Sequence, residues 1–205
     1  MESKTSRIKF LKQLTKINKP YFTIVDIKKI LNLPKNSLYV TCCRLAKDKD
    51  LYRLKQGIYT LDNSPQNIQY IANTLYFPSY LSCESALALH GILNQIPYTS
   101  TFVTKNKTKK LTLGGQTIEY HQIIPCLFCD YILQKNLYIA IPEKALLDQL
   151  YFVSLGRAYL DYDELNLHEL SKTKFLKLSK KFPVRTQKLA KELVKNFGKI
   201  SITVK

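Results

Sequence analysis

Residues 23–61 constrain the fold more than any other part of the sequence, because their hydrophobic period changes from helical to strand-like within a short stretch. Thr23 can cap a helix, and Asp26 stands where a carboxylate can bond the free amides of the first turn. Isoleucine and leucine then recur at helical spacing until Asn32-Leu33-Pro34 breaks the pattern. We therefore expect a short helix that begins after Thr23.

A second helix is expected over residues 36–48. Leu38, Cys42 and Leu45 fall on one side of it at spacings of four and three, with Thr41 at the edge. Polar, basic and small apolar side chains occupy the opposite side. The helix thus has an inner face for a core and an outer face for a partner.

Two strand-like segments follow at residues 51–54 and 58–61. The turn between them contains Gly57, which can adopt a positive φ. Helix, turn, helix and basic hairpin in this order predict a winged helix-turn-helix. A generic small helical domain is the alternative.

The N-terminus does not read as a signal peptide, because lysines and an arginine interrupt its apolar residues. It predicts instead the first helix of the same domain. We expect Ile8, Leu11, Leu14 and Ile17 to form the inner stripe of that helix.

The charge distribution favours a polyanionic partner. Of a net charge of +17, residues 1–61 carry 14 Lys and Arg against 4 Asp and Glu, and residues 171–205 carry 11 against 1. Residues 62–140 are nearly neutral, and residues 141–170 are acidic. Such an excess of cations attracts phosphate irrespective of base sequence. A membrane surface is the competing explanation, but no segment has the length and apolarity of a spanning helix.

Length and composition allow two small domains, and the expected helices and strands give them an α+β fold. A chain of 205 residues with 45% hydrophobic content can form a winged domain at 1–62 and a larger domain at 66–205. The polar turn at 62–65 is the expected linker. Five cysteines, two of them adjacent, indicate a reducing cytoplasm and not a disulfide framework.

The second domain is expected to hold a small sheet with flanking helices. Strands are predicted at 99–104, 110–113, 117–124, 127–133 and 137–141, with a hairpin turn at Gly114-Gly115, and helices at 66–75, 82–93 and from Pro142. In the helix at 82–93 we expect Ser82 as the cap and Ala86, Leu89 and Leu93 inside. From Asp161 the chain reads as basic and helical, with Leu189, Leu193 and Phe197 as an apolar stripe near its end.

Several motifs in this domain resemble a known family. They are YLSCESALALHGI at 80–92, QIP at 95–97, TFVT at 101–104, IEYH at 118–121 and IAIPEKALLD at 139–148. The series resembles the AbiEi antitoxins of type IV (abortive infection) toxin–antitoxin systems, from the winged domain to about Tyr151. The resemblance implies a winged helix that represses its own operon by binding inverted repeats. It also implies a C-terminal antitoxin domain that antagonises a nucleotidyltransferase-type toxin.

Two side-chain groups invite a catalytic interpretation, and neither fits one. Glu143, Lys144 and Asp148 resemble a metal-dependent nuclease set, but they lie within two turns of one predicted helix, whereas such sites converge from adjacent strands. Helix capping and ion pairing explain them better. Near Ser82, Ser85 and His90 we expect neither a strand-to-helix elbow nor a Gly-rich oxyanion loop. We therefore expect no enzymatic activity.

A zinc site has partial support only. Cys126 and Cys129 have ligand spacing, with His121 upstream, and Cys83 and His90 could in principle complete a set. A second closely spaced ligand pair is missing, and Leu127-Phe128 between the cysteines indicates a core strand. No Gly-rich phosphate loop occurs either. We expect no metal and no cofactor.

The outer face of the second helix and the hairpin supply the expected contacts to double-stranded DNA. For base edges in the major groove we expect Ser37, Tyr39, Val40 and Arg44. For phosphates we expect Asn36, Lys47, Arg53, Lys55 and Gln56. The alternative is a winged module that binds protein or RNA without preference for one operator.

Overall fold

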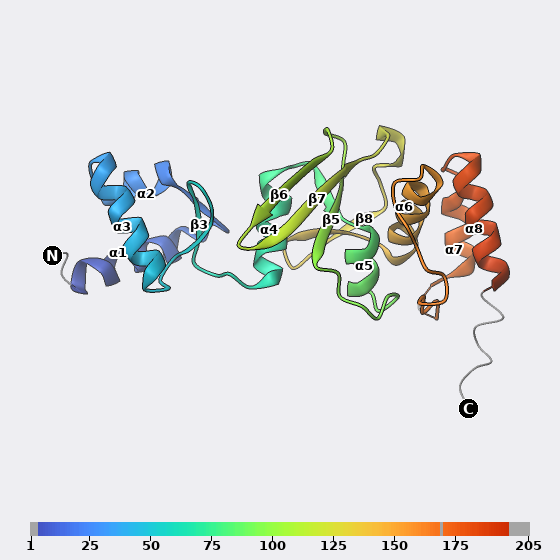
Figure 1. Cartoon of the computed structure of the whole chain (residues 1–205), viewed down its shortest axis with the longest axis horizontal. Coiled ribbons are helices and arrows are strands. Elements are labelled where there is room, and N and C mark those ends of the chain that lie inside the picture. Colours follow the sequence, from blue (N-terminus) through green and yellow to red (C-terminus); the bar gives the residue numbers. More distant parts are fainter. Residues whose placement is uncertain (1–3, 169, 197–205) are drawn as a thin grey trace, which may run out of the picture. The chain divides into compact units, whose positions relative to one another are not determined.

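The computed structural model describes residues 4–168 and 170–196, which fold into two compact units (Figure 1). One comprises Met1–Ala72 and Thr112–Gln116, and the other Asn73–Leu111 and Thr117–Lys205. The fold is mixed α+β, with a small antiparallel sheet in the first unit and a larger mixed sheet in the second. Within the described residues, none of the helices combines the length and apolarity needed to cross a lipid bilayer.

The first unit contains three complete helices, the first part of the helix Pro65–Leu75 and a three-stranded sheet. Its elements are α1 (Lys4–Ile17), β1 (Phe22–Thr23), α2 (Ile24–Leu31), α3 (Lys35–Lys47), β2 (Tyr52–Lys55) and β3 (Ile58–Thr60). Strand β3 lies in the middle of the sheet and pairs antiparallel with both neighbours. Strand β1 has no counterpart in the sequence prediction, because a strand of two residues shows no alternating pattern.

The core of the first unit combines side chains from all three helices and the sheet. Its buried members are Phe10, Leu14, Phe22, Ile27, Leu38, Cys42, Leu45, Leu51 and Tyr59. Burial raises the pKa of the Cys42 thiol to about 11, so this cysteine packs as a neutral side chain.

The predicted inner stripe of α1 was wrong in two positions. Ile8 is 54% exposed and Ile17 is 44% exposed, whereas Phe10 and Leu14 are buried. Leu11 packs partly against this core. The inward face of α1 is therefore centred on the i, i+4 pair Phe10 and Leu14, which turns Ile8 and Ile17 to its margins.

The predicted linker at 62–65 is a tight polar turn that leads into α4 (Pro65–Leu75). The Asp62 carboxylate accepts from the backbone N and the hydroxyl of Ser64, each at 2.8 Å. The Asn67 amide donates to the Thr60 hydroxyl at 3.0 Å. The division between the two units falls inside α4, after Ala72, and not at this turn.

The second unit is built on a six-stranded sheet with the order β6-β7-β5-β4-β9-β8. Its elements after α4 are β4 (Ser79–Leu81), α5 (Cys83–Leu89), β5 (Thr99–Thr104), β6 (Lys109–Leu113), β7 (Gln116–Gln122), the 3-10 turn η1 (Pro125–Leu127), β8 (Tyr131–Gln134), β9 (Leu137–Ala140), α6 (Pro142–Ser154), α7 (Lys172–Ser179) and α8 (Val184–Asn196). β4 pairs parallel with β9 and β5 with β7, whereas β4 pairs antiparallel with β5.

The structure corrects three predictions in this unit. Residues 127–133 are not one strand, because η1 ends at Leu127 and β8 begins only at Tyr131, after Asp130 at a φ of +58°. Helix α5 stops at Leu89, which is 49% exposed and not inside. Leu93 lies beyond that helix and forms a β-bridge with Leu165. Strand β4 was not predicted at all.

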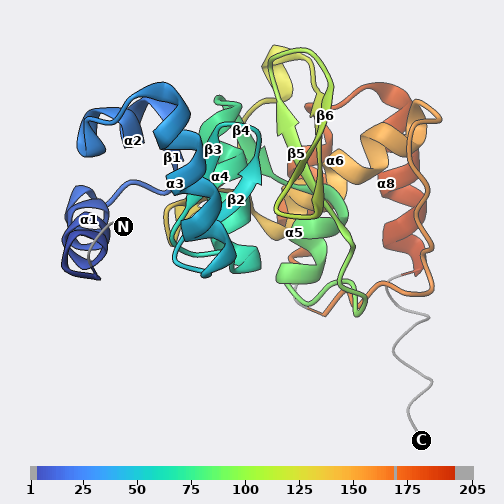
Figure 2. The same cartoon turned by 60° about the vertical axis from the view of Figure 1, so that its left-hand side comes forward.

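The C-terminal part is helical only from Lys172 onward. Helix α6 packs against α5, α7 and α8, and the two views agree that α7 and α8 lie on the side of α6 away from the sheet (Figures 1 and 2). The buried stripe of α8 is Thr186, Ala190 and Leu193, with Leu189 half-buried. Phe197, predicted for this stripe, lies outside the described residues.

A network of buried polar side chains connects α6 to β4. The Lys144 ammonium forms an ion pair with Asp148 one turn later and donates to the Tyr80 hydroxyl at 2.7 Å. Asp148 also accepts from the hydroxyls of Tyr80 at 3.0 Å and Ser82 at 2.8 Å. Both charged residues are almost fully buried, so each charge is balanced by a partner within the core.

Candidate nucleic-acid interface

Helix α2 begins with the capping box that the sequence predicts. The Asp26 backbone N donates to the Thr23 hydroxyl at 3.2 Å, and the Thr23 backbone N donates to the Asp26 carboxylate at 2.8 Å. Lys19 adds an ion pair to the same carboxylate at 3.1 Å. Partial burial would raise the pKa of Asp26, but the hydrogen bonds from Thr23 and Lys19 outweigh it and lower that pKa.

The turn between α2 and α3 is set by two residues. Asn32 adopts the left-handed conformation, with φ at +49°, and its N–H donates to the carbonyl of Lys28 at 2.8 Å. Pro34 then precedes α3, and its carbonyl accepts from the Leu38 N–H at 2.9 Å. The break at 32–34 seen in the sequence therefore ends one helix and starts the next.

Helix α3 divides into the two faces that the sequence predicts. Leu38, Cys42 and Leu45 are buried, and Thr41 is buried at the edge of the same face. The expected contact residues of α3 are all exposed: Asn36, Ser37, Tyr39, Val40, Arg44 and Lys47. Tyr39 is 42% exposed and Val40 is 51% exposed, so both present apolar surface to solvent. Apolar side chains there can pack on a thymine methyl group.

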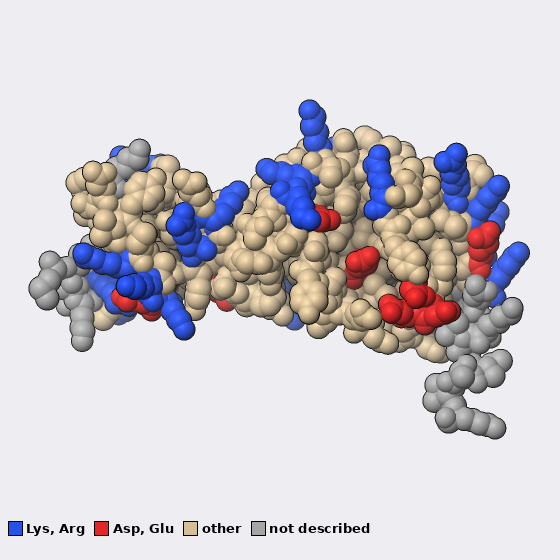
Figure 3. Space-filling model, in the orientation of Figure 1, with Lys and Arg blue, Asp and Glu red and all other residues tan. Residues whose placement is uncertain are grey.

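The outer face of α3 keeps its positive charge. The helix has no acidic residue, and the acids that follow it, Asp48 and Asp50, form ion pairs with Arg7 of α1. In the described part of the chain neither Arg44 nor Lys47 has an ion-pair partner. On the face of the first unit visible in Figure 3, blue Lys and Arg side chains outnumber red acidic ones.

The hairpin of β2 and β3 presents the remaining expected contacts. Arg53, Lys55 and Gln56 are exposed, and Gly57 completes the turn at a φ of +75°. The register shifts between Arg53 and Lys55 where β2 pairs with β3. The Gly57 carbonyl accepts from the Ile24 N–H at 3.0 Å, which ties the tip of the hairpin to the first residue of α2.

Two basic residues in the first unit were missed by the sequence analysis. Lys28 and Lys29 are exposed in the last turn of α2, directly before the turn that leads to α3. Cations at that end of a helix are favoured by the helix dipole. The signal was present in the sequence as a basic pair at the C-terminus of the first helix.

The side chains considered for catalysis in the second unit already have structural partners. A strand-to-helix elbow does exist, contrary to expectation, since β4 runs into α5 through Cys83 at a φ of +52°. However, the Ser85 hydroxyl donates to the carbonyl of Thr99 at 3.1 Å, and a His90 ring nitrogen lies 2.8 Å from the carbonyl of Ala140. The Ser82 hydroxyl, like Lys144 and Asp148, belongs to the buried network.

The cysteine pair of the second unit does not converge with other ligands. Cys126 is exposed in η1, and Cys129 donates to the carboxylate of Asp130 at 3.0 Å. Burial and that acceptor raise the pKa of the Cys129 thiol to about 11. Among the residues that the structure describes, no three His, Cys, Asp or Glu side chains lie close enough together to hold a metal ion.

The sequence was also compared with known proteins. No model of a known protein family matches it, and neither does any of the curated proteins with which it was compared.

Proposed function

We propose that the first unit is a winged helix-turn-helix that binds double-stranded DNA, and that the chain represses its own operon. The proposal rests on the outer surface of α3 and of the β2–β3 hairpin. All nine expected contact residues are exposed there, and in the described part of the chain none of their cations forms an ion pair. A surface held in place by a core but left without internal partners is suited to a polyanion.

In this proposal α3 enters the major groove. Arg44 reads a guanine edge through its paired N–H donors, Ser37 and Tyr39 donate to or accept from base edges, and Val40 packs on a thymine methyl. Arg53 and Lys55 of the hairpin contact phosphates beside the groove, together with Gln56. Asn36 and Lys47 contact phosphates at the two ends of α3. The excess of cations accelerates association and makes the affinity depend on salt.

The antitoxin part of the proposal rests on the resemblance of the second unit to AbiEi proteins. In that reading the second unit antagonises a nucleotidyltransferase-type toxin encoded with it. Several of its motif residues, such as Tyr80, Ser82, Lys144 and Asp148, are buried and bonded to one another. We propose that the antagonism is non-enzymatic.

A mobility-shift titration tests DNA binding. The full chain is titrated onto a duplex of the promoter upstream of its own gene, and onto a duplex of equal length and composition with scrambled sequence. We expect preference for the promoter duplex, with protection of inverted repeats in a footprint. Equal affinity for both duplexes would contradict a repressor and would favour a module that binds protein or RNA.

A further inference from the structure

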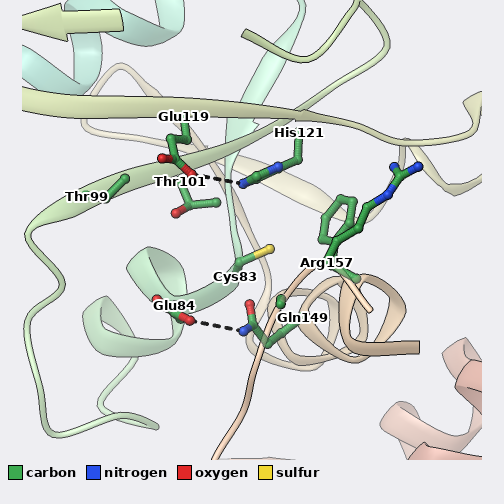
Figure 4. Close-up of a pocket in the computed structure, with 10 residues that line it drawn as sticks. Cys83, Glu84, Thr99, Thr101, Glu119, His121, Gln149 and Arg157 are labelled. Atoms are coloured by element: carbon green, nitrogen blue, oxygen red, sulfur yellow. Dashed lines mark hydrogen bonds and ion pairs between the residues drawn. The ribbon is translucent and has the colours of Figure 1, made fainter. Parts of the chain in front are cut away.

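The second unit contains a cavity of about 240 Å³, lined by both polar and apolar side chains, between β5, β7, α5 and α6 (Figure 4). Its lining includes Cys83 and Glu84 of α5, Thr101 of β5, Glu119 and His121 of β7, and Gln149 of α6. All of these residues belong to the second unit, so the cavity is formed without any contribution from the proposed DNA-binding region. None of its residues is among the expected DNA contacts.

Gln149 is held so that it presents a hydrogen-bond acceptor to this cavity. Its amide nitrogen donates to Glu84 Oε1 at 3.2 Å and to the carbonyl of Tyr159 at 2.8 Å, so both N–H groups are used. The side-chain orientation follows from these two acceptors. Gln149 is only 2% exposed, and both of these hydrogen bonds use its amide nitrogen and not its Oε1. In Figure 4 this oxygen is turned to the side on which Cys83 and Thr101 lie.

Two carboxylates face the cavity from opposite walls (Figure 4). Glu84 offers Oε2, since Gln149 uses its Oε1. Glu119 is bonded through Oε1 to Lys110 at 2.7 Å, and its Oε2 lies 3.5 Å from His121 Nε2. Burial, together with the charge of Arg157, lowers the pKa of His121, so the ring is neutral at pH 7.

The same cavity has a flat apolar side and an open cationic margin. The ring of Phe152 lines it, with its centroid 5.2 Å from that of His121. Arg157 also contributes to the lining, but in Figure 4 its side chain extends away from both carboxylates. Because Lys110 pairs with Glu119 Oε1 and Gln149 bonds Glu84 Oε1, the carboxylate atoms left for a ligand are Oε2 of Glu119 and Oε2 of Glu84.

We propose that this cavity binds a guanidinium group, carried either by a free small molecule or by an arginine side chain of a partner protein. A guanidinium offers five donors in one plane, so it can bond one carboxylate through two parallel N–H groups and keep further donors for a second acceptor in the lining. Its flat faces can stack on Phe152. A guanidinium is also hydrated more weakly than an ammonium, so its burial costs less hydration free energy. A divalent ion fits less well, because among the described residues no three metal-ligating side chains converge.

Calorimetric titration of the full chain with butylguanidine, and with butylammonium as the matched ligand, tests the proposal. We expect one site that prefers butylguanidine. Glu84→Gln keeps the acceptor for Gln149 but removes the charge, and should weaken binding about tenfold, the usual effect of a charge-assisted hydrogen bond. Glu192→Gln, an exposed glutamate on α8, is the matched control and should leave binding unchanged. Arg157→Ala should tighten binding, because it removes a like charge.

A blocked Gly-Arg-Gly peptide distinguishes the two sources of the group. If it binds as well as butylguanidine, an arginine of a partner protein is the ligand. If only butylguanidine binds, the ligand is a free small molecule. The absence of binding, equal affinity for butylammonium, or an unchanged affinity in Glu84→Gln would overturn the proposal. These outcomes leave DNA binding by the first unit unaffected, so the two proposals fail independently.

Discussion

Arg44 lies on the exposed outer side of α3, and among the described residues no carboxylate pairs with it. If it reads a base edge, its loss should cost mainly specific binding. We predict that Arg44→Ala weakens binding to the operator by about 1–3 kcal/mol and leaves binding to random DNA nearly unchanged. Fluorescence anisotropy with both duplexes measures the difference. An equal loss on random DNA would contradict a base contact.

Lys55 of the hairpin is expected to affect DNA binding differently from Arg44. It is exposed beside the turn and is expected to contact a phosphate. Lys55→Ala should weaken binding to operator and random duplexes alike and should reduce the slope of log affinity against log salt by about one unit. A selective loss on the operator alone would place Lys55 on a base instead.

Lys144 has its ammonium buried between Asp148 and the Tyr80 hydroxyl. Removal of the cation leaves a buried carboxylate without its counter-charge, so we predict that Lys144→Met lowers the free energy of unfolding by about 3–5 kcal/mol. The double variant Lys144→Met, Asp148→Leu removes both charges, so its free energy of unfolding should fall less than that of the single variant. Urea denaturation compares the three proteins. A double variant less stable than the single one would show that the network contributes more than charge balance.

At the scale of an element, the capping box makes the start of α2 sensitive to acid. The fold lowers the pKa of Asp26 below its ordinary value of 3.8, so its contribution to stability is present above that value and is lost as the pH falls through the lowered pKa. We predict that Asp26→Asn costs about 1 kcal/mol at neutral pH and progressively less in acid. Urea denaturation across pH, with the exposed Asp163→Asn as control, measures this. A cost that persists unchanged in acid would contradict the charged cap.

Helix α8 buries one stripe and exposes its lysines. Lys188, Lys191 and Lys195 are exposed, whereas Ala190 and Leu193 are buried. Neutralising the three lysines as glutamines should therefore leave the melting temperature nearly unchanged and weaken binding to DNA or to an acidic partner. Thermal melting and binding assays check both parts. Unchanged binding to both would leave solubility as the role of these lysines.

At the scale of the whole molecule, the two proposed activities should separate by variant. The first unit carries the expected DNA contacts, and the family motifs lie in the second. We predict that Arg44→Ala with Lys55→Ala in the full chain abolishes promoter repression but still rescues cells from the cognate toxin. A promoter reporter and co-expression with the toxin measure the two activities in the same strain. Simultaneous loss of both from a folded protein would contradict this division.

Much of the fold could be predicted from residues that are adjacent in the sequence. The capping pair Thr23 and Asp26, the break at Pro34 and the turn at Gly57 each depend on a few adjacent residues, and the structure has all three as expected. Pro142 likewise begins α6 as expected. Predictions failed where the deciding contact is distant in sequence. Strand β4 is too short to show a pattern, and Leu89 became exposed because α5 ends there.

The sequence by itself determined the order of the helices, the hairpins and the exposed face of α3, because hydrophobic period, caps and turns act between near neighbours. Only the tertiary structure decided which polar residues were brought together. Glu84, Glu119 and Gln149 lie far apart in the chain, and pairing of β5 with β7 and packing of α5 on α6 place them around one cavity. The tertiary structure also decided the burial of Lys144 and Asp148, because their partners are Tyr80 of β4 and Ser82, which follows that strand.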